Sequence, residues 1–118
     1  MLNKNAKKWV KALRSGKYKQ GNLVLHNLKT DSFCCLGVAC DLATKEGVFT
    51  SGITIMDDGA GVTLPRAVQK WLRLSTTAGK FKSGQSLVGL NDKENFTFPQ
   101  IATVIESEPQ GLFLTRKR

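Results

Sequence analysis

The sequence has no long hydrophobic run, and this absence limits where the protein can work. Its apolar stretches are short, and the one from Phe33 to Ala39 is interrupted by a glycine. A membrane-spanning helix needs about 20 mostly apolar residues, so we expect no membrane span. The first residues, Met1 to Lys8, are polar and basic, and no apolar stretch follows them, which argues against a secretory signal. We therefore expect a cytoplasmic protein.

Cysteine and histidine are scarce. There are three cysteines, Cys34, Cys35 and Cys40, and one histidine, His26. An odd and tightly clustered set of cysteines is a poor disulfide framework, and reduced thiols are the default in a cytosol. A structural zinc site needs four Cys or His ligands, so all four residues would have to converge. Adjacent cysteines on one element point in different directions, so we expect buried thiols, with no metal and no cofactor.

Thiol catalysis also has little support in the pattern. A cysteine nucleophile needs a nearby base and a lowered pKa. His26 could pair with Cys34 across a hairpin, but nothing in the spacing requires it. The apolar neighbours of Cys34 favour burial of the thiol, and a lone histidine is more often structural or solvated.

Acidic residues are absent from residues 1–30, whereas basic residues are frequent there. The whole chain has 18 Lys and Arg against 9 Asp and Glu, a net charge of +9. Eight basic residues fall in the acid-free part: Lys4, Lys7, Lys8, Lys11, Arg14, Lys17, Lys19 and Lys29. Such asymmetry favours an anionic partner, most often nucleic acid. The alternative is that the charge serves solubility alone.

The few carboxylates show no diagnostic spacing. Asp57, Asp58 and Asp92 would suit Mg²⁺ if the fold brought them together, but Asp-Asp-Gly and Asn-Asp are also ordinary turn sequences. The segment Gly59–Gly61 lacks the Gly-Lys-Ser/Thr ending of a phosphate-binding loop. These observations favour turns over a metal-dependent site, and a binding protein over an enzyme.

Length and composition indicate one globular domain over residues 1–118. The chain is 41% hydrophobic and 23% charged, a globular balance, and its length is common for a single domain. We expect a compact α+β fold with three to four helices and a small antiparallel sheet.

Hydrophobic periodicity and capping signals place the elements. Helices are expected over residues 5–15, 35–46 and 65–74, and a fourth after Thr97, where Thr97 and Gln100 form a capping box. Residues 23–28 and 33–36 are expected to pair as a hairpin. The remaining expectations are short strands in 48–56, a flexible loop at 57–61, a mobile loop at 75–86, a turn at Asn91-Asp92 and a late strand at 112–114.

Four segments, in order along most of the chain, resemble a family of small phage and prophage proteins. They are Trp9–Gly21 (WVKALRSGKYKQG), Phe33–Leu42 (FCCLGVACDL), Leu64-Pro65 through Trp71-Leu72, and Leu90-Asn91-Asp92 followed by Phe98 and Ile101-Ala102. The resemblance implies an accessory protein acting in the cytosol of a host cell. It assigns no catalytic residue.

Lysine and arginine on two predicted helices form the candidate site. On the first helix the basic residues lie opposite the apolar stripe of Ala6, Trp9, Val10 and Leu13. The candidate anion-binding residues are Lys7, Lys8, Lys11, Arg14, Lys17, Tyr18, Lys19, Arg66, Lys70 and Arg73. Tyr18 either stacks on a base or is a half-buried ring that packs on the domain.

Three functional hypotheses follow. The first is a non-enzymatic protein that binds a nucleic acid or a nucleotide, with sequestration as a counter-defence role. The second is an inhibitor or adaptor that docks its basic face on an acidic host protein. The third is a metal-dependent enzyme acting on nucleic acid through Asp57, Asp58 or Asp92.

Overall fold

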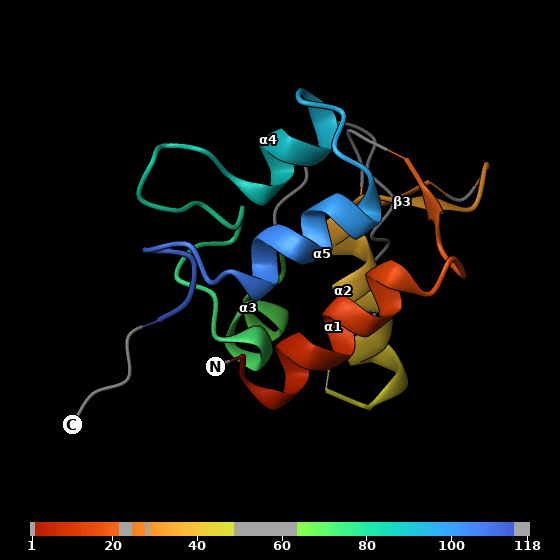
Figure 1. The fold of residues 1–118 in the computed structure, drawn as a ribbon. Coiled ribbons are helices and arrows are strands. Elements are labelled where there is room, and N and C mark those ends of the chain that lie inside the picture. Colours follow the sequence, from red (N-terminus) through yellow and green to blue (C-terminus); the bar gives the residue numbers. More distant parts are fainter. Residues whose placement is uncertain (1, 22–24, 28, 49–63, 115–118) are drawn as a thin grey trace.

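Five helices and three short strands are formed by the residues that the computed structural model describes, which are 2–21, 25–27, 29–48 and 64–114. In chain order they are α1 (Lys4–Arg14), β1 (Lys19–Gln20), β2 (His26–Asn27), β3 (Ser32–Phe33), α2 (Cys35–Lys45), α3 (Arg66–Leu72), α4 (Leu87–Asp92) and α5 (Phe98–Glu106) (Figure 1). The α+β class is confirmed. Apart from Val48, the strands expected in 48–56 and the loop at 57–61 lie outside the described residues.

The three strands form one small sheet in the order β1-β3-β2. β2 and β3 pair antiparallel, with His26 opposite Phe33, as in the expected hairpin, but Cys35 and Leu36, expected in its second strand, belong to α2. β1 pairs with β3 in parallel, with Lys19 opposite Ser32. The sheet is therefore mixed rather than antiparallel, because β1 adds to the free edge of the hairpin and runs in the same direction as β3.

Helix α1 spans Lys4–Arg14, one residue nearer the N-terminus at each end than the helix expected over residues 5–15. The side chain of Asn3 caps the helix by accepting a hydrogen bond from the backbone N–H of Ala6 at 2.9 Å. Gly16 follows the helix with φ of +78°, a conformation that glycine adopts without strain. The predicted apolar stripe, Ala6, Trp9, Val10 and Leu13, is buried along its whole length.

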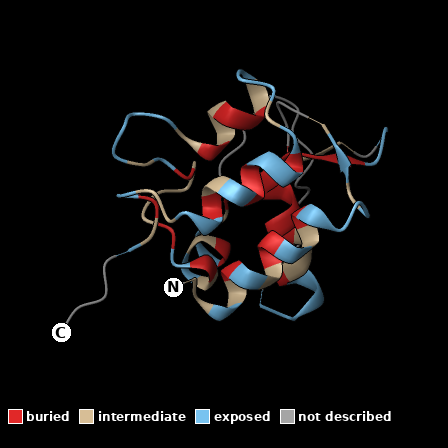
Figure 2. Cartoon of the chain, in the orientation of Figure 1, coloured by how far each residue is buried: buried red, intermediate tan, exposed pale blue. Residues whose placement is uncertain are grey.

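Helix α2 is the centre of the core, and it packs against α1, α3 and α4. Every residue from Cys35 to Cys40 is buried (Figure 2), whereas Thr44 and Lys45 at the end of the helix are exposed. The indole N–H of Trp9 donates to the carbonyl of Cys35 at 2.9 Å, which joins α1 to the start of α2. A Cβ at Gly37 would overlap the carbonyl oxygen of Leu25, so this close contact requires glycine.

The C-terminal half shows one confirmed element and one correction. The capping box is present as predicted: Thr97 accepts from the backbone of Gln100, and the Gln100 side chain accepts from the backbone of Thr97. The predicted turn at Asn91-Asp92 is wrong, because both residues belong to α4. The side chain of Ser86 caps α4 by accepting from the backbone of Gly89.

The late strand expected at 112–114 is reduced to one isolated antiparallel bridge between Leu74 and Phe113. Residues 75–86 contain turns and a second isolated bridge, between Lys80 and Ser86. None of the described helices is long and apolar enough to cross a membrane.

Candidate anion-binding surface

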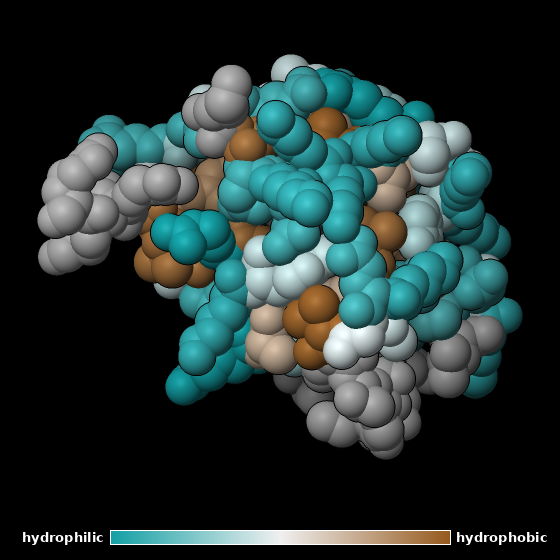
Figure 3. Space-filling model, turned by 90° about the horizontal axis from the view of Figure 1, so that it is seen from below, coloured by the Kyte–Doolittle hydropathy of each residue, from teal (hydrophilic) through white to brown (hydrophobic). Residues whose placement is uncertain are grey.

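The outward face of α1 carries a row of lysines. Lys4, Lys7 and Lys11 are exposed and follow one another at spacings of three and four residues, which places them on one side of the helix. We call these three residues the α1 lysine row. Figure 3 views the molecule from below Figure 1, the side on which α1 lies, and most of the described surface there is hydrophilic. No ion pair joins the row to an acid among the described residues.

Two other basic residues of α1 have acidic partners from distant parts of the chain. Lys8 pairs with Glu46 at 2.6 Å, and Arg14 pairs with Glu106 at 2.7 Å. The hydrogen bond from Arg14, followed by its positive charge, lowers the pKa of Glu106, and the same hydrogen bond raises the pKa of Arg14. Both pairs are solvent-accessible, so they contribute little to stability, but they fix the direction of the two side chains.

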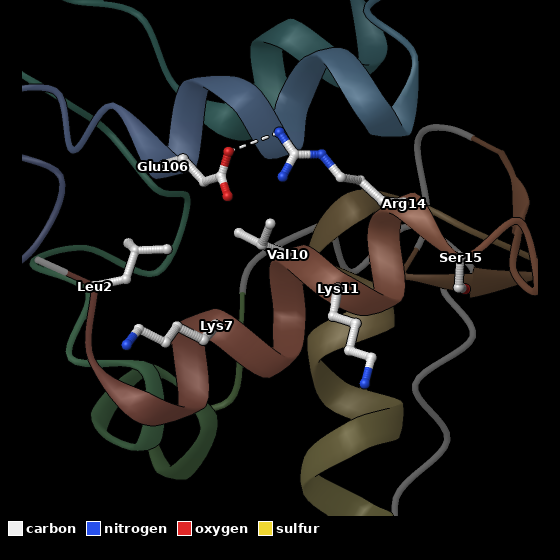
Figure 4. A pocket seen from close by; sticks show the side chains of 7 residues that line it. All are labelled: Leu2, Lys7, Val10, Lys11, Arg14, Ser15 and Glu106. Atoms are coloured by element: carbon white, nitrogen blue, oxygen red, sulfur yellow. Dashed lines mark hydrogen bonds and ion pairs between the residues drawn. The ribbon is translucent and has the colours of Figure 1, made fainter.

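A pocket of about 500 Å³ opens beside the α1 lysine row, between α1 and α5. It is lined by Leu2, Lys7, Val10, Lys11, Arg14, Ser15 and Glu106. In Figure 4, Arg14 reaches across to Glu106 on α5, and Val10 lies between the two helices. The ammonium groups of Lys7 and Lys11 extend away from α1 at the rim. The pocket therefore combines an apolar floor with a basic rim.

The loop after α1 has two exposed lysines around a packed tyrosine. Lys17 and Lys19 are exposed, whereas Tyr18 is partly buried. The Tyr18 hydroxyl donates to Asp41 at 2.5 Å, its ring meets Phe33 edge-on at 5.0 Å, and the Lys45 ammonium lies 5.8 Å from its centroid. Burial and the hydrogen bond to Asp41 raise the pKa of Tyr18. Tyr18 therefore has the packed position described above as the alternative to base stacking.

The second basic stripe, Arg66, Lys70 and Arg73, is exposed on α3 and just after it. Asn3 and Asn5 donate hydrogen bonds to the carbonyls of Leu72 and Trp71, both at 2.9 Å. These bonds hold the end of α3 beside the start of α1. Of the stripe, Arg73 follows α3 at this junction, whereas Arg66 begins α3, roughly 10 Å further along the helix axis.

The thiols and the histidine do not form a reactive group. Cys34, Cys35 and Cys40 are free and buried, as predicted. Burial raises the pKa of Cys34 to about 11 and of Cys40 to about 12, and it raises the pKa of Cys35 well above its usual value. The imidazole of His26 pairs with Asp31 at 2.9 Å and stacks on Phe33. Within the described ranges, no three His, Cys, Asp or Glu side chains come together as a metal site; Asp57 and Asp58 lie outside them.

A comparison with known protein families identifies the family of this chain. The model of a family described as Domain of unknown function (DUF8296) matches residues 1–109. The chain belongs to this family. No curated protein and no solved structure matches it.

The buried side chain of Asn91 is the centre of a polar arrangement. The side chain of Asn91 is 2% exposed. Its oxygen accepts from the Gln20 side chain at 3.0 Å and from the backbone of Cys35 at 3.3 Å, and its amide donates to the carbonyl of Gly21 at 2.9 Å. Gln20 in turn accepts from the backbone of Phe98 at 3.0 Å. We call these five residues the Asn91 network.

The Asn91 network joins residues that lie far apart in the sequence. Gln20-Gly21 ends the segment Trp9–Gly21, Cys35 lies in Phe33–Leu42, and Asn91 and Phe98 lie in the segment that begins at Leu90. Among the described residues, no buried side-chain nitrogen or oxygen lacks a hydrogen-bond partner. The network is therefore internally satisfied, and it serves to hold α4, α5, β1 and the start of α2 together.

Sequence reasoning missed the residues that complete the pocket. Glu106, which lines the pocket from α5, lies 92 residues from its partner Arg14. No local sequence pattern indicates such a pair. Leu2 and Val10 carry no signal of a binding role either, because apolar residues near a helix are normally read as core.

Proposed function

We propose that this protein binds nucleic acid through the outward face of α1 and carries out no reaction on it. The observation that carries the proposal is the α1 lysine row: exposed, on one side of one helix, and without an ion pair to a described acid. Lys17 and Lys19 extend the positive charge beyond the end of α1, and Arg73 extends it beyond the start.

The spacing of the lysines suits a polyanion. Lys4 and Lys11 are seven residues apart, which corresponds to roughly 10 Å along the helix axis. One strand of a duplex carries a phosphate about every 3.4 Å along its axis, so the row can meet several phosphates at once. Binding of this kind releases counterions, depends strongly on salt and carries little sequence preference.

Nucleic acid is favoured over an acidic protein by the pocket beside the row. An acidic protein surface would meet the same ammonium groups, but its carboxylates would leave an apolar cavity of about 500 Å³ unfilled. A nucleic acid brings phosphates and apolar ring faces together in one repeating unit. The acidic host protein remains the competing partner in the test below.

The three cysteine thiols are buried and protonated, which is why the proposal includes no thiol-catalysed step. All three are buried, and their raised pKa values keep them protonated at neutral pH. The resemblance to phage and prophage proteins supports a setting in the cytoplasm of an infected host. There, sequestering a nucleic acid or a nucleotide would oppose a defence that depends on it.

The proposal is tested by the salt dependence of oligonucleotide binding. Fluorescence anisotropy with a labelled 12-nucleotide single strand is measured between 50 and 200 mM salt. The double variant Lys7→Gln/Lys11→Gln is expected to bind more weakly and to lower the slope of log K against log salt by about 1.4, or 0.7 for each lost phosphate contact. The matched control is Lys80→Gln/Lys93→Gln. These exposed lysines lie near α4, which Figure 1 shows at the opposite end of the molecule from α1.

Two outcomes would contradict the proposal. One is the absence of binding at 50 mM salt, where electrostatic attraction is strong. The other is an equal loss of affinity in the α1 double variant and the control, which would show that only total charge matters. Binding to an acidic polypeptide such as polyglutamate, with equal affinity and the same dependence on Lys7 and Lys11, would favour the acidic-protein partner instead.

A further inference from the structure

The pocket between α1 and α5 has a composition that phosphate binding alone does not explain. Its surface is mainly apolar, and Leu2 and Val10 contribute to it. Lys7 and Lys11 stand at its rim, with their charged ends directed away from the floor (Figure 4). A purely phosphate-binding surface would need only the rim.

Hydrogen bonds join Arg14 to α5 on one side of this pocket. Its terminal nitrogen Nη2 donates to the carboxylate of Glu106 at 2.7 Å and to the hydroxyl of Thr103 at 3.1 Å. Both acceptors belong to α5, so the guanidinium bridges the two helices. The carboxylate offsets much of the charge of Arg14, which makes the side chain a weaker phosphate ligand than a free arginine. A fixed guanidinium remains a flat surface, and such planes stack well on aromatic rings.

We propose that the α1–α5 pocket receives one unpaired nucleobase, which stacks on Arg14 and packs against Val10 and Leu2, while its phosphate groups lie at Lys7 and Lys11. Unstacked bases are commonly held on aromatic side chains or on arginine planes. The volume of about 500 Å³ lies within the usual range for pockets that bind small molecules. A paired base is enclosed in its helix and cannot enter, so the ligand is single-stranded nucleic acid or a free nucleotide.

This inference rests on the proposed function and adds a requirement to it. Nucleic-acid binding through lysines alone needs only phosphates, whereas the pocket needs a base. Two ligands with the same phosphates, one with bases and one without, therefore distinguish binding through the lysines from binding of a base in the pocket.

The experiment compares a 12-nucleotide thymidine strand with an abasic strand of the same length, at the same salt. We expect the thymidine strand to bind about fivefold more tightly, the scale of a favourable cation–ring contact. The variant Arg14→Lys keeps the charge but loses the plane, so it should lose most of the preference for the thymidine strand. The control Lys93→Arg makes the reverse exchange at an exposed position at the end of α4, outside the candidate anion-binding residues, and should keep the preference.

Glu106→Gln gives a second readout that a merely structural role would not produce. Removing the carboxylate adds one net positive charge and releases Arg14 from its partner. Affinity for the abasic strand should therefore rise about twofold, as expected for one added charge, while the preference for the thymidine strand falls. An unchanged preference for the thymidine strand in Glu106→Gln would contradict the assignment of Arg14 as the stacking surface.

The outcomes distinguish the inference from the proposed function. Equal binding of the thymidine and abasic strands by the unmodified protein would overturn the inference and leave lysine-mediated binding intact. Failure of both strands to bind would overturn both. Competition with thymidine monophosphate identifies the source of the base. If the nucleotide displaces the strand and the same concentration of inorganic phosphate does not, the pocket also binds free nucleotides. Equal displacement by the two would contradict binding of free nucleotides in the pocket.

Discussion

The outward face of α1 and the Asn91 network use polar side chains in opposite ways. The Asn91 amide is 2% exposed and is bonded to backbone or side-chain groups 56 to 71 residues away. The α1 lysine row is exposed and has no acidic partner among the described residues. The buried Asn91 side chain therefore helps to hold the fold together. The exposed lysine side chains of α1 are the ones that a ligand can reach.

The largest effect in this comparison is expected at Gly37, on the buried side. In Gly37→Ala the new Cβ meets the backbone carbonyl of Leu25, which cannot move without displacing the segment that leads into β2. We expect a loss of about 3 kcal/mol in the free energy of unfolding, the upper end of the cost of overpacking. Urea unfolding measures it, with Gly47→Ala as the control, where an added Cβ meets nothing within 4 Å. Because Gly47 has a positive φ of +76°, the control has its own cost of about 1 kcal/mol. A smaller loss at Gly37 than at Gly47 would show that the contact with Leu25 is not tight.

A somewhat smaller loss is expected when the Asn91 network is cut. Asn91→Ala leaves the Gly21 carbonyl and the Cys35 N–H without their partner. Unpaired buried groups of this kind cost about 1–3 kcal/mol, so we expect about 2 kcal/mol. Gln85→Ala, at an exposed position, is the control and should change stability by less than about 0.5 kcal/mol. Similar values for the two variants would mean that the network adds specificity to the fold without adding stability.

The buried thiols make stability depend on pH in the alkaline range. Burial raises the pKa of Cys34 from 9.0 to about 11 and of Cys40 to about 12. Above pH 9 the unfolded chain loses thiol protons that the folded chain keeps, so stability falls as pH rises. We expect about 1 kcal/mol less stability at pH 10 than at pH 8 for each thiol. Urea unfolding at both pH values measures this, and Cys40→Ala should reduce the difference; an unchanged difference would indicate that other groups cause it.

The smallest effect on stability is expected on α1 itself. Lys7→Gln/Lys11→Gln should change the free energy of unfolding by no more than about 0.5 kcal/mol, because both side chains are exposed. The same variant is expected to lose nucleic-acid affinity. A large loss of stability would contradict this expectation, because the lysines would then stabilise the fold rather than form a binding surface.

The sequence predicted those elements that are fixed by residues close together in the chain. The apolar stripe predicted α1, and Thr97 with Gln100 predicted the start of α5. Helix α4 was missed because Asn91 and Asp92 are typical turn residues, and the bonds that fix Asn91 come from Gly21 and Cys35, 70 and 56 residues away. The parallel pairing of β1 with β3 was missed because two-residue strands carry no signal of direction.

The candidate site was predictable in its charges and not in its shape. Helical spacing alone placed Lys7 and Lys11 on the outer face of α1. The pocket needs α5 beside α1, and the orientation of Arg14 needs Glu106, 92 residues away. The position of Tyr18 was likewise decided by Asp41 and Phe33 rather than by its lysine neighbours.

The most direct test of the central claim is a map of the ligand on the backbone. Nitrogen-15 NMR spectra of the protein are recorded during titration with a 12-nucleotide single strand at low salt. We expect the largest amide shifts in Lys4 to Ser15 and in α5 near Glu106, with little change at Gly21, Cys35 and Asn91. Shifts centred on the Asn91 network, or shifts spread evenly over all basic residues, would contradict it.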